Sequence, residues 1–217
     1  MRNFCINPGW IRLFLTLAVI FSAQDWAIRA QDISYPDQIK AHRKKIREEH
    51  KNDPRSPLRP SDLRSLRYFP ADENWKIEAD FHEFSTKDSV MMPTSSGRLK
   101  YFLRYARAEF SVEGQTYSLS LYRPAAAAPG YSGLFLPFYD ETNGSETYGG
   151  GRYLDLDSTH IRDGKIRIDF NHAYNPWCAY SGGFNCPVPP QENRLNLALR
   201  AGEKIYKGRH RQGSKGK

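Results

Sequence analysis

Residues 106–121, ARAEFSVEGQTYSLSL, decide the fold class of this chain. Apolar and polar side chains alternate from Ala106 to Val112 and again from Tyr117 to Leu121. A period of two places the apolar side chains on one face of a β-strand and the polar ones on the other. Because the turn Glu113-Gly114-Gln115 separates the two runs, the stretch predicts a β-hairpin with one buried and one solvated face.

Other short apolar runs continue this pattern on both sides of the hairpin. They lie at Ile77–Phe81, Leu134–Phe138, Tyr153–Leu156, Ile166–Phe170 and Leu195–Leu199. No helix of crossover length separates them, which argues against a parallel α/β sheet. The 13 Tyr and 12 Phe also favour strands, because aromatic side chains suit a pleated, half-buried surface. We therefore predict a mainly β fold: an antiparallel β-barrel or sandwich of about seven strands with an N-terminal helical arm.

The helical arm precedes the strands. A helix is predicted over residues 36–51, which start with a proline that suits a first helical turn. Ile39 and Ile46 give this helix only a narrow apolar face. A proline-rich stretch from Pro54 ends it, and a second short helix is predicted to start at Ser61.

The first thirty residues predict a secretory signal peptide. The apolar run Leu13–Phe21 is too short to span a bilayer, and small residues follow it up to Ala30. We expect cleavage after Ala30, which leaves Gln31 as the mature N-terminus; the alternative is an uncleaved anchor. The protein is therefore expected to be exported, as a periplasmic or secreted protein.

The net charge of +8 belongs to the flanks of the chain. Residues 40–67 contain ten Lys or Arg and four acids, and residues 200–217 contain seven and one, whereas residues 68–199 are mildly acidic. Basic ends are usually solvated, and export argues against nucleic acid as a partner. Contact of the basic tail with an anionic envelope surface is the alternative. The predicted organisation is a signal peptide (1–30), a helical arm (31–67), a β domain (68–204) and a basic disordered tail (205–217).

Four groups of short motifs follow one another along the mature chain. They are Arg55-Ser56-Pro57-Leu58 with Tyr68-Phe69-Pro70; Pro137-Phe138 with Glu146–Leu154; Asp169-Phe170-Asn171 with Ala173-Tyr174-Asn175-Pro176, Cys178-Ala179-Tyr180 and Cys186-Pro187; and Glu192-Asn193-Arg194-Leu195 with Ala201-Gly202-Glu203. In this order they resemble the domain-of-unknown-function family 1684 of bacteria and archaea, from about His42 to Glu203. The resemblance implies a shared fold and a shared site, but no known activity. The family usually has Arg in place of His172, and often in place of Tyr139, so His172 is a poor candidate for the family's chemistry.

Two polar segments are candidates for a site. The first runs from Asp140 to Arg152. It contains three consecutive glycines, whose backbone N–H groups could hold an anion, and the polar residues Asp140, Glu141, Glu146, Tyr148 and Arg152. No Lys-Ser/Thr follows, so a phosphate loop is not indicated, and the alternative is a glycine-rich loop that permits tight turns. The second segment runs from Asp169 to Cys186, as a long loop that is either functional or simply hydrogen-bonded in place.

The two segments are expected to meet. If the strands at 153–156 and 166–170 pair as a hairpin, the loops flanking them share one end of the sheet. The predicted pocket is lined by Glu146, Tyr148, Arg152, Asp169, Asn171 and Tyr174. The alternative is an internal pair between Arg152 and a carboxylate that only ties the loops together.

Cys178 and Cys186 are expected to form a disulfide, because two cysteines in an exported protein usually pair. The alternatives are a catalytic thiol, or a metal site that would need two further ligands, such as His160 or His172. No spacing typical of metal ligands occurs, and no cofactor is predicted. Neither Gly-x-Ser-x-Gly nor His-Glu-x-x-His is present, so no hydrolase class is indicated.

Three functions remain open. The leading one is binding of a small polar or anionic ligand by the loops around Arg152 and Asn171. The second is a hydrolase-like enzyme that uses Glu146 or Asp169 with Tyr148 and Arg152. The third is a structural envelope protein. A carboxylate with a raised pKa in a shared pocket would favour the enzyme.

Overall fold

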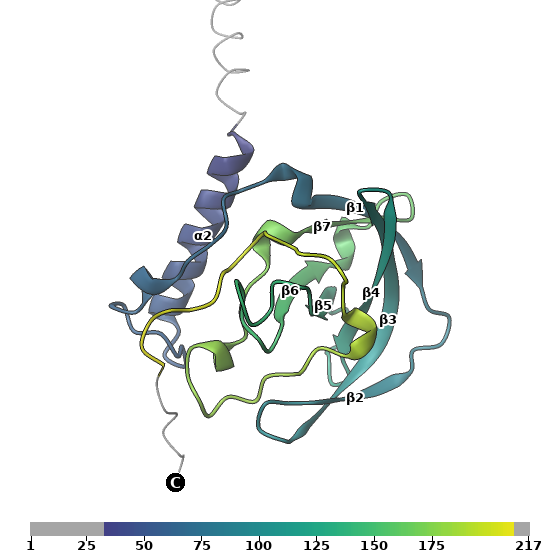
Figure 1. Ribbon diagram of the computed structural model, residues 1–217. Coiled ribbons are helices and arrows are strands. Elements are labelled where there is room, and N and C mark those ends of the chain that lie inside the picture. Colours follow the sequence, from purple (N-terminus) through teal and green to yellow (C-terminus); the bar gives the residue numbers. More distant parts are fainter. Residues whose placement is uncertain (1–32, 211–217) are drawn as a thin grey trace, which may run out of the picture. The chain divides into compact units, whose positions relative to one another are not determined.

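The structure is a computed structural model that describes residues 33–210 (Figure 1). The predicted signal peptide and the last seven residues of the predicted tail lie outside the described residues. The chain divides into two units after Gln38, and the fold described below is that of the second unit.

The N-terminal arm contains an α-helix, α2, from Tyr35 to Asn52. The prediction of a helix over residues 36–51 is confirmed, and the helix ends before Pro54, which disfavours the helical conformation of the preceding residue. Where a second short helix was predicted, a single 3₁₀ turn, η1, spans Leu63–Ser65. Among residues 33–210, no helix is both long and apolar enough to cross a membrane.

Seven strands form one antiparallel sheet that curls into a half-barrel, so the mainly β prediction is confirmed. The strands are β1 (Lys76–Glu83), β2 (Ser89–Pro93), β3 (Leu99–Val112), β4 (Gln115–Pro124), β5 (Gly133–Phe138), β6 (Arg152–Asp157) and β7 (Lys165–Asp169). Their order is β6-β5-β4-β3-β1-β7, and β2 pairs with β3 beside this path. Five further 3₁₀ turns are η2 (Glu73–Trp75), η3 (Ser158–His160), η4 (Phe170–His172), η5 (Trp177–Ala179) and η6 (Gln191–Asn193).

The hairpin predicted from residues 106–121 is the β3–β4 pair (Figure 1). Val112 and Gln115 face each other across a two-residue loop, Glu113-Gly114, and both loop residues have positive φ angles of 52° and 79°. Two consecutive positive φ angles define the type I′ turn, whose twist matches that of the flanking strands. The glycine takes the second of these positions without steric cost.

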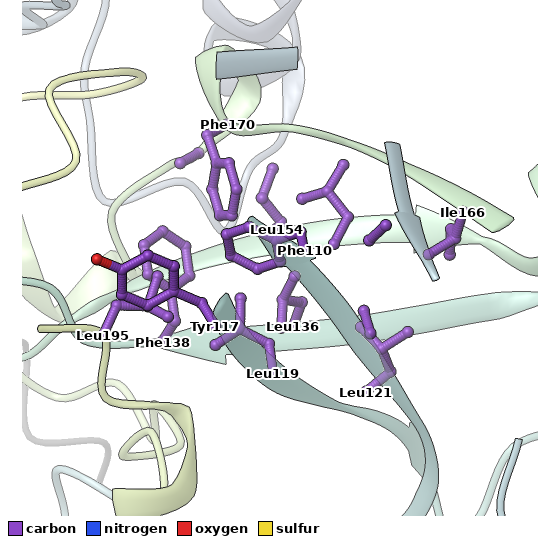
Figure 2. Close-up of a cluster of buried hydrophobic side chains, with 14 of the residues drawn as sticks. Phe110, Tyr117, Leu119, Leu121, Leu136, Phe138, Leu154, Ile166, Phe170 and Leu195 are labelled. Carbon is purple, nitrogen blue, oxygen red and sulfur yellow. The ribbon is translucent and has the colours of Figure 1, made fainter. Parts of the chain in front are cut away.

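The core is a cluster of buried apolar side chains supplied by the strands and by the segments that follow β7 (Figure 2). Phe170 packs against Phe110 and Phe138, with ring centroids 5.9 and 5.6 Å apart. The alternating apolar residues of the hairpin supply much of the remainder, as expected from a period of two. Buried members of this core are Ala106, Ala108, Phe110, Tyr117, Leu119, Leu121, Leu134, Leu136, Phe138, Leu154, Ile166, Ile168, Phe170, Leu195 and Leu199.

The prediction of a strand at Leu195–Leu199 is wrong. Leu195 and Leu199 are buried as the alternation implied, but the segment does not join the sheet as a strand. The Leu195 N–H donates to the Tyr139 carbonyl, and the Leu199 carbonyl accepts from the Arg152 guanidinium instead of from a neighbouring strand. The seventh strand is β2, which the sequence did not reveal.

The predicted hairpin between β6 and β7 does not form, because β7 pairs with β1 and β6 pairs with β5. The two strands occupy opposite ends of the strand order. The chain after β7 nevertheless returns to β6: Tyr153 and Tyr174 exchange two backbone hydrogen bonds, of 2.9 and 3.0 Å. The residues that follow β7 therefore lie beside β6 by a different route from the one predicted.

Candidate functional site

A cavity of about 660 Å³ opens between α2 and the irregular segment that follows β7. This volume lies in the range of small-molecule sites. Its lining comes from four separate parts of the chain: residues 42–53, Tyr68, residues 154–180 and Glu203. The lining residues are His42, Arg43, Lys45, Ile46, Glu49, His50, Asp53, Tyr68, Leu154, Asp155, Asn171, His172, Ala173, Tyr174, Asn175, Trp177, Tyr180 and Glu203.

The helix wall is held by arginines rather than by a broad apolar face. Arg43 donates to the Phe69 carbonyl at 2.9 Å, and Arg47 donates to the carbonyls of Leu63 and, at 3.1 Å, Leu66. Both guanidinium groups lie over the ring of Tyr68, with centroid distances of 4.7 and 5.8 Å. Hydrogen bonds to carbonyls and cation–π contacts thus fix α2 over the cavity.

Two histidines meet across the cavity. The rings of His42 on α2 and His172 on η4 are stacked, with centroids 4.0 Å apart. Burial, and then the neighbouring His172, lowers the pKa of His42 to about 4, and burial also lowers the pKa of His172. Both rings are therefore neutral near pH 7, which allows them to stack without charge repulsion.

A third histidine, His50, lies further along the helix. Its Nδ1 is 3.0 Å from the Ser56 hydroxyl, and burial lowers its pKa. Its ring approaches Trp177 at 6.4 Å and meets Tyr180 edge-on at 5.9 Å. This end of the cavity is aromatic, and the carboxylates of Glu49 and Asp53 lie close enough to His50 to oppose the effect of burial on its pKa.

The floor of the cavity is built around Glu203, whose residue is 3% exposed. Its carboxylate accepts hydrogen bonds from the Tyr180 hydroxyl at 2.7 Å and from the Asn175 backbone N–H at 3.1 Å. Burial raises the pKa of Glu203 to about 7, against the lowering effect of these donors. Burial and the adjacent Glu203 raise the pKa of Tyr180, so its hydroxyl remains a donor.

The Tyr68 hydroxyl and Oδ1 of Asn175 are buried polar atoms of the lining, and neither has a hydrogen-bond partner among residues 33–210. Asn175 is 1% exposed. Buried polar groups are normally satisfied, and each that is not costs free energy. Because both residues line the cavity, a molecule bound there could supply the missing partners.

Two of the six residues predicted to share a pocket line this cavity, Asn171 and Tyr174. The Asn171 side chain bridges the backbone of Asp72, accepting at 3.0 Å and donating at 2.8 Å, and it also donates to Asp169 at 3.0 Å. The Tyr174 hydroxyl donates to Asp155 at 2.7 Å. Asp169 caps the turn η4 and is not part of the lining.

Arg152 lies behind the cavity floor and is fully buried. It donates to Asp140 at 2.7 Å, to the Leu199 carbonyl at 2.8 Å and to the Ala201 carbonyl. This is an internal pair between arginine and a carboxylate, with Asp140 as the partner. It holds the chain just before Glu203 and thereby positions that carboxylate.

Glu146 and Tyr148 also lie outside the cavity lining. Glu146 forms an ion pair with Arg200 at 2.8 Å, on side chains that are 35% and 61% exposed. Tyr148 packs against a hydrophobic cluster that includes the lining residue Tyr180. The Glu146 carbonyl accepts from the Ile205 N–H at 2.9 Å. The glycine-rich segment therefore supports the cavity from behind and does not line it.

The predicted disulfide between Cys178 and Cys186 is confirmed, with Cα atoms 6.4 Å apart. It closes the loop that carries Trp177 and Tyr180 into the cavity. A disulfide suggests a non-cytoplasmic setting. Within residues 33–210, no group of three or more His, Cys, Asp or Glu could hold a metal ion.

Sequence reasoning missed the helix wall and the floor. His42, Ile46 and His50 are spaced by four residues, which places them on one face of α2, and this spacing was visible in the sequence. Glu203 was noted only as the end of a motif. No local sequence pattern around Glu203 indicates that its carboxylate is buried.

The chain belongs to the family described as protein of unknown function (DUF1684), which it matches over residues 61–204. It is similar to the solution NMR structure of an uncharacterized protein from gene locus rrnAC0354 of Haloarcula marismortui. The two are 34% identical with a TM-score of 0.62, and the match covers 84% of this chain and 96% of that one. No curated protein matches the chain.

Proposed function

We propose that this protein is an exported domain that binds a small polar or anionic molecule in the cavity beneath α2. The observation that carries the proposal is the pair of buried, unpartnered polar atoms, Tyr68 OH and Asn175 Oδ1, in a cavity of about 660 Å³. A ligand that satisfies both atoms recovers the free energy lost by burying them. The aromatic lining supplies apolar contact, as in most small-molecule sites.

The experiment uses a substitution on α2 that fills the cavity with a larger side chain. Ile46 is half-buried and lines the cavity, whereas Lys44 is exposed on the same helix and does not. We expect compounds from a metabolite library that raise the melting temperature of the native protein to have no effect on Ile46→Trp. The control Lys44→Trp should respond like the native protein. Hits that stabilise both variants equally would contradict the proposal.

A second candidate function is acid–base catalysis by Glu203. A carboxyl group with a pKa of about 7 in a cavity can both accept and return a proton near neutral pH. Of the carboxylates considered for a hydrolase-like enzyme, Glu146 and Asp169 do not line the cavity, and Glu203 takes their place. For any ligand that proves to be a substrate, Glu203→Gln should keep binding but abolish turnover. Unchanged turnover would eliminate this candidate.

The disulfide supports export, and the basic ends support contact with an anionic envelope surface. Intact-mass measurement of protein exported by a native-like host should give a chain that begins at Gln31. Binding of that chain to anionic vesicles should weaken when residues 207–217 are removed. A chain that still begins at Met1, or vesicle binding that survives the truncation, would contradict these two proposals respectively.

A further inference from the structure

The Tyr68 hydroxyl and Asn175 Oδ1, the two buried atoms that carry the proposed function, are uncharged. The Tyr68 hydroxyl can donate or accept a hydrogen bond, and Asn175 Oδ1 accepts. A ligand hydroxyl group offers one donor and two acceptor positions, so it can satisfy either atom. Neither atom requires a charged partner.

Anionic ligands meet an unfavourable lining. Four residues of the cavity carry carboxyl groups, whereas two carry permanent positive charges, Arg43 and Lys45. Arg43 already donates to the Phe69 carbonyl and lies over the ring of Tyr68. Lys45 is 74% exposed at the rim, where it pairs with Glu49 at 3.7 Å. Both permanent cations of the lining therefore already have partners within the protein.

Cationic ligands lack a strong counter-ion at the floor. Glu203 is buried, accepts hydrogen bonds from Tyr180 and Asn175, and exchanges its proton near neutral pH. Both oxygens of this carboxyl group already accept hydrogen bonds, and a ligand hydroxyl can donate to them or accept from the protonated form. Asp155, nearer the surface, already accepts from the Tyr174 hydroxyl at 2.7 Å.

One end of the cavity is aromatic. Trp177 is half-buried there, held edge-on by Phe184 with centroids 5.3 Å apart, and Tyr180 and His50 lie beside it. An aromatic ring packs well against the flat C–H face of a cyclic molecule. Neutral hydrogen-bonding atoms at the floor and aromatic rings at one end suit a ring that carries hydroxyl groups.

We propose that the molecule bound beneath α2 is an uncharged sugar, with hydroxyl groups bonded to Tyr68 and Asn175 and its ring face against Trp177. This inference rests on the proposed function and names the class of its ligand. The volume of about 660 Å³ admits a mono- or disaccharide.

The test compares neutral sugars with charged derivatives of the same rings. Saturation-transfer NMR and calorimetry on the exported protein would use glucose, galactose, mannose and maltose as probes. Glucosamine, glucuronate and glucose 6-phosphate would be the charged counterparts. We expect at least one neutral sugar to bind, and its charged derivatives to bind more weakly.

The matched variants are Tyr68→Phe and Tyr101→Phe. The first removes a buried hydroxyl that has no hydrogen-bond partner in the described structure, so it should fold normally. Loss of one neutral hydrogen bond should weaken sugar binding about three- to tenfold. Tyr101 is 57% exposed on β3, outside the cavity, and its variant should bind like the native protein.

Each remaining outcome would contradict either the sugar proposal or the binding function on which it rests. Tighter binding of an amino, acidic or phosphorylated derivative would overturn the uncharged class, as would sugar binding that is unaffected by Tyr68→Phe. If no sugar binds but the metabolite library yields ligands blocked by Ile46→Trp, the sugar is wrong and the binding function stands. If neither panel yields a ligand, both proposals fail.

Discussion

Two carboxylates, Asp140 and Glu203, are buried to the same extent, each 3% exposed, but their partners differ. Asp140 faces the Arg152 guanidinium at 2.7 Å and accepts from the Thr142 N–H at 2.8 Å. Glu203 accepts only from neutral donors, and no ion pair to it forms among residues 33–210. The first carboxylate has its charge compensated, whereas the second retains the cost of desolvation as a raised pKa.

This difference in partners distinguishes the structural role of Asp140 from the role expected of Glu203 in a functional site. The Asp140–Arg152 pair is enclosed by protein and holds the chain at Leu199 and Ala201. Glu203, two residues further along, lines a cavity. Burial of a carboxylate is therefore not in itself a sign of a site, and its partner and the space in front of it decide between the two roles.

The largest expected effect on stability comes from breaking the ion pair between Asp140 and Arg152. Arg152→Ala removes three hydrogen bonds and leaves Asp140 buried without a counter-ion, which should lower the free energy of unfolding by about 3–5 kcal/mol. The matched control is Arg200→Ala, which removes an exposed ion pair with Glu146 and should cost less than about 1 kcal/mol. Urea denaturation measures both. Equal, small losses would show that the buried pair is not a structural tie.

The second expected effect is a pH dependence of stability that arises from the Glu203 carboxylate. The pKa of Glu203 is raised from 4.5 to about 7, so the folded protein binds this proton more tightly than the unfolded chain. The stabilisation is complete below pH 4.5 and is lost as the pH rises through 7, by about 3 kcal/mol in all.

Glu203→Gln cannot ionise and should lack this part of the pH dependence. Unfolding curves of the native protein and the variant at several pH values from 4 to 8 would measure the difference. Other titrating groups are common to both proteins and cancel in the comparison. If the two free energies stay parallel across this range, Glu203 does not have a raised pKa, and its candidacy for acid–base catalysis ends.

The parts of the fold that the sequence predicted are those encoded by local pattern. Alternation from Ala106 to Leu121, with a glycine in the turn, predicted the β3–β4 hairpin because strand and turn preferences act over a few residues. The strand β2 was missed because three of its five residues, Val90, Met91 and Met92, are apolar in succession and hide the alternation. The run at Leu195–Leu199 alternates, but it makes only isolated backbone hydrogen bonds: the Leu197 carbonyl accepts from the Glu141 N–H, and the Leu199 carbonyl accepts from the Arg152 side chain.

The cavity could be predicted only in part, because it depends on contacts between distant segments. Asn171 and Tyr174 were recognised as polar residues in an irregular loop, and they do line it. His42 on α2 and Glu203 near the C-terminus meet them through tertiary packing, which no local pattern records. Arg152 and Asp140 were recognised in one polar cluster, but Glu146 or Asp169 was expected to pair with Arg152, and only the tertiary structure identifies Asp140 as its partner.

The disulfide that closes the loop containing Tyr180 should have a smaller effect than either carboxylate. In the chain-entropy model, the bridge between Cys178 and Cys186 closes a short loop and contributes about 2–3 kcal/mol. Cys178→Ala/Cys186→Ala should lower the free energy of unfolding by this amount and loosen the loop that carries Trp177 and Tyr180. Denaturation of the double variant, with tryptophan fluorescence as the probe, tests both effects. Mass spectrometry showing two free thiols in the exported native protein would contradict the bridge itself.

The smallest expected effect on stability comes from His42 on α2. Its pH dependence is opposite in sign to that of Glu203. The pKa of His42 is lowered to about 4, so between pH 6.5 and 4 the unfolded chain binds this proton more tightly than the folded protein. The stabilisation is present above pH 6.5 and is lost as the pH falls through 4, by about 1 kcal/mol after allowance for solvent screening. Protonation would also place a charge against the ring of His172, 4.0 Å away, and near Arg43 and Lys45, whereas Asp169 favours the protonated form.

His42→Gln should therefore resist acid better than the native protein, whereas replacing His160, exposed on η3, should change nothing. Unfolding measured from pH 7 to 4 decides the matter: if the native protein and His42→Gln lose stability in parallel, the stacked histidines do not couple α2 to pH.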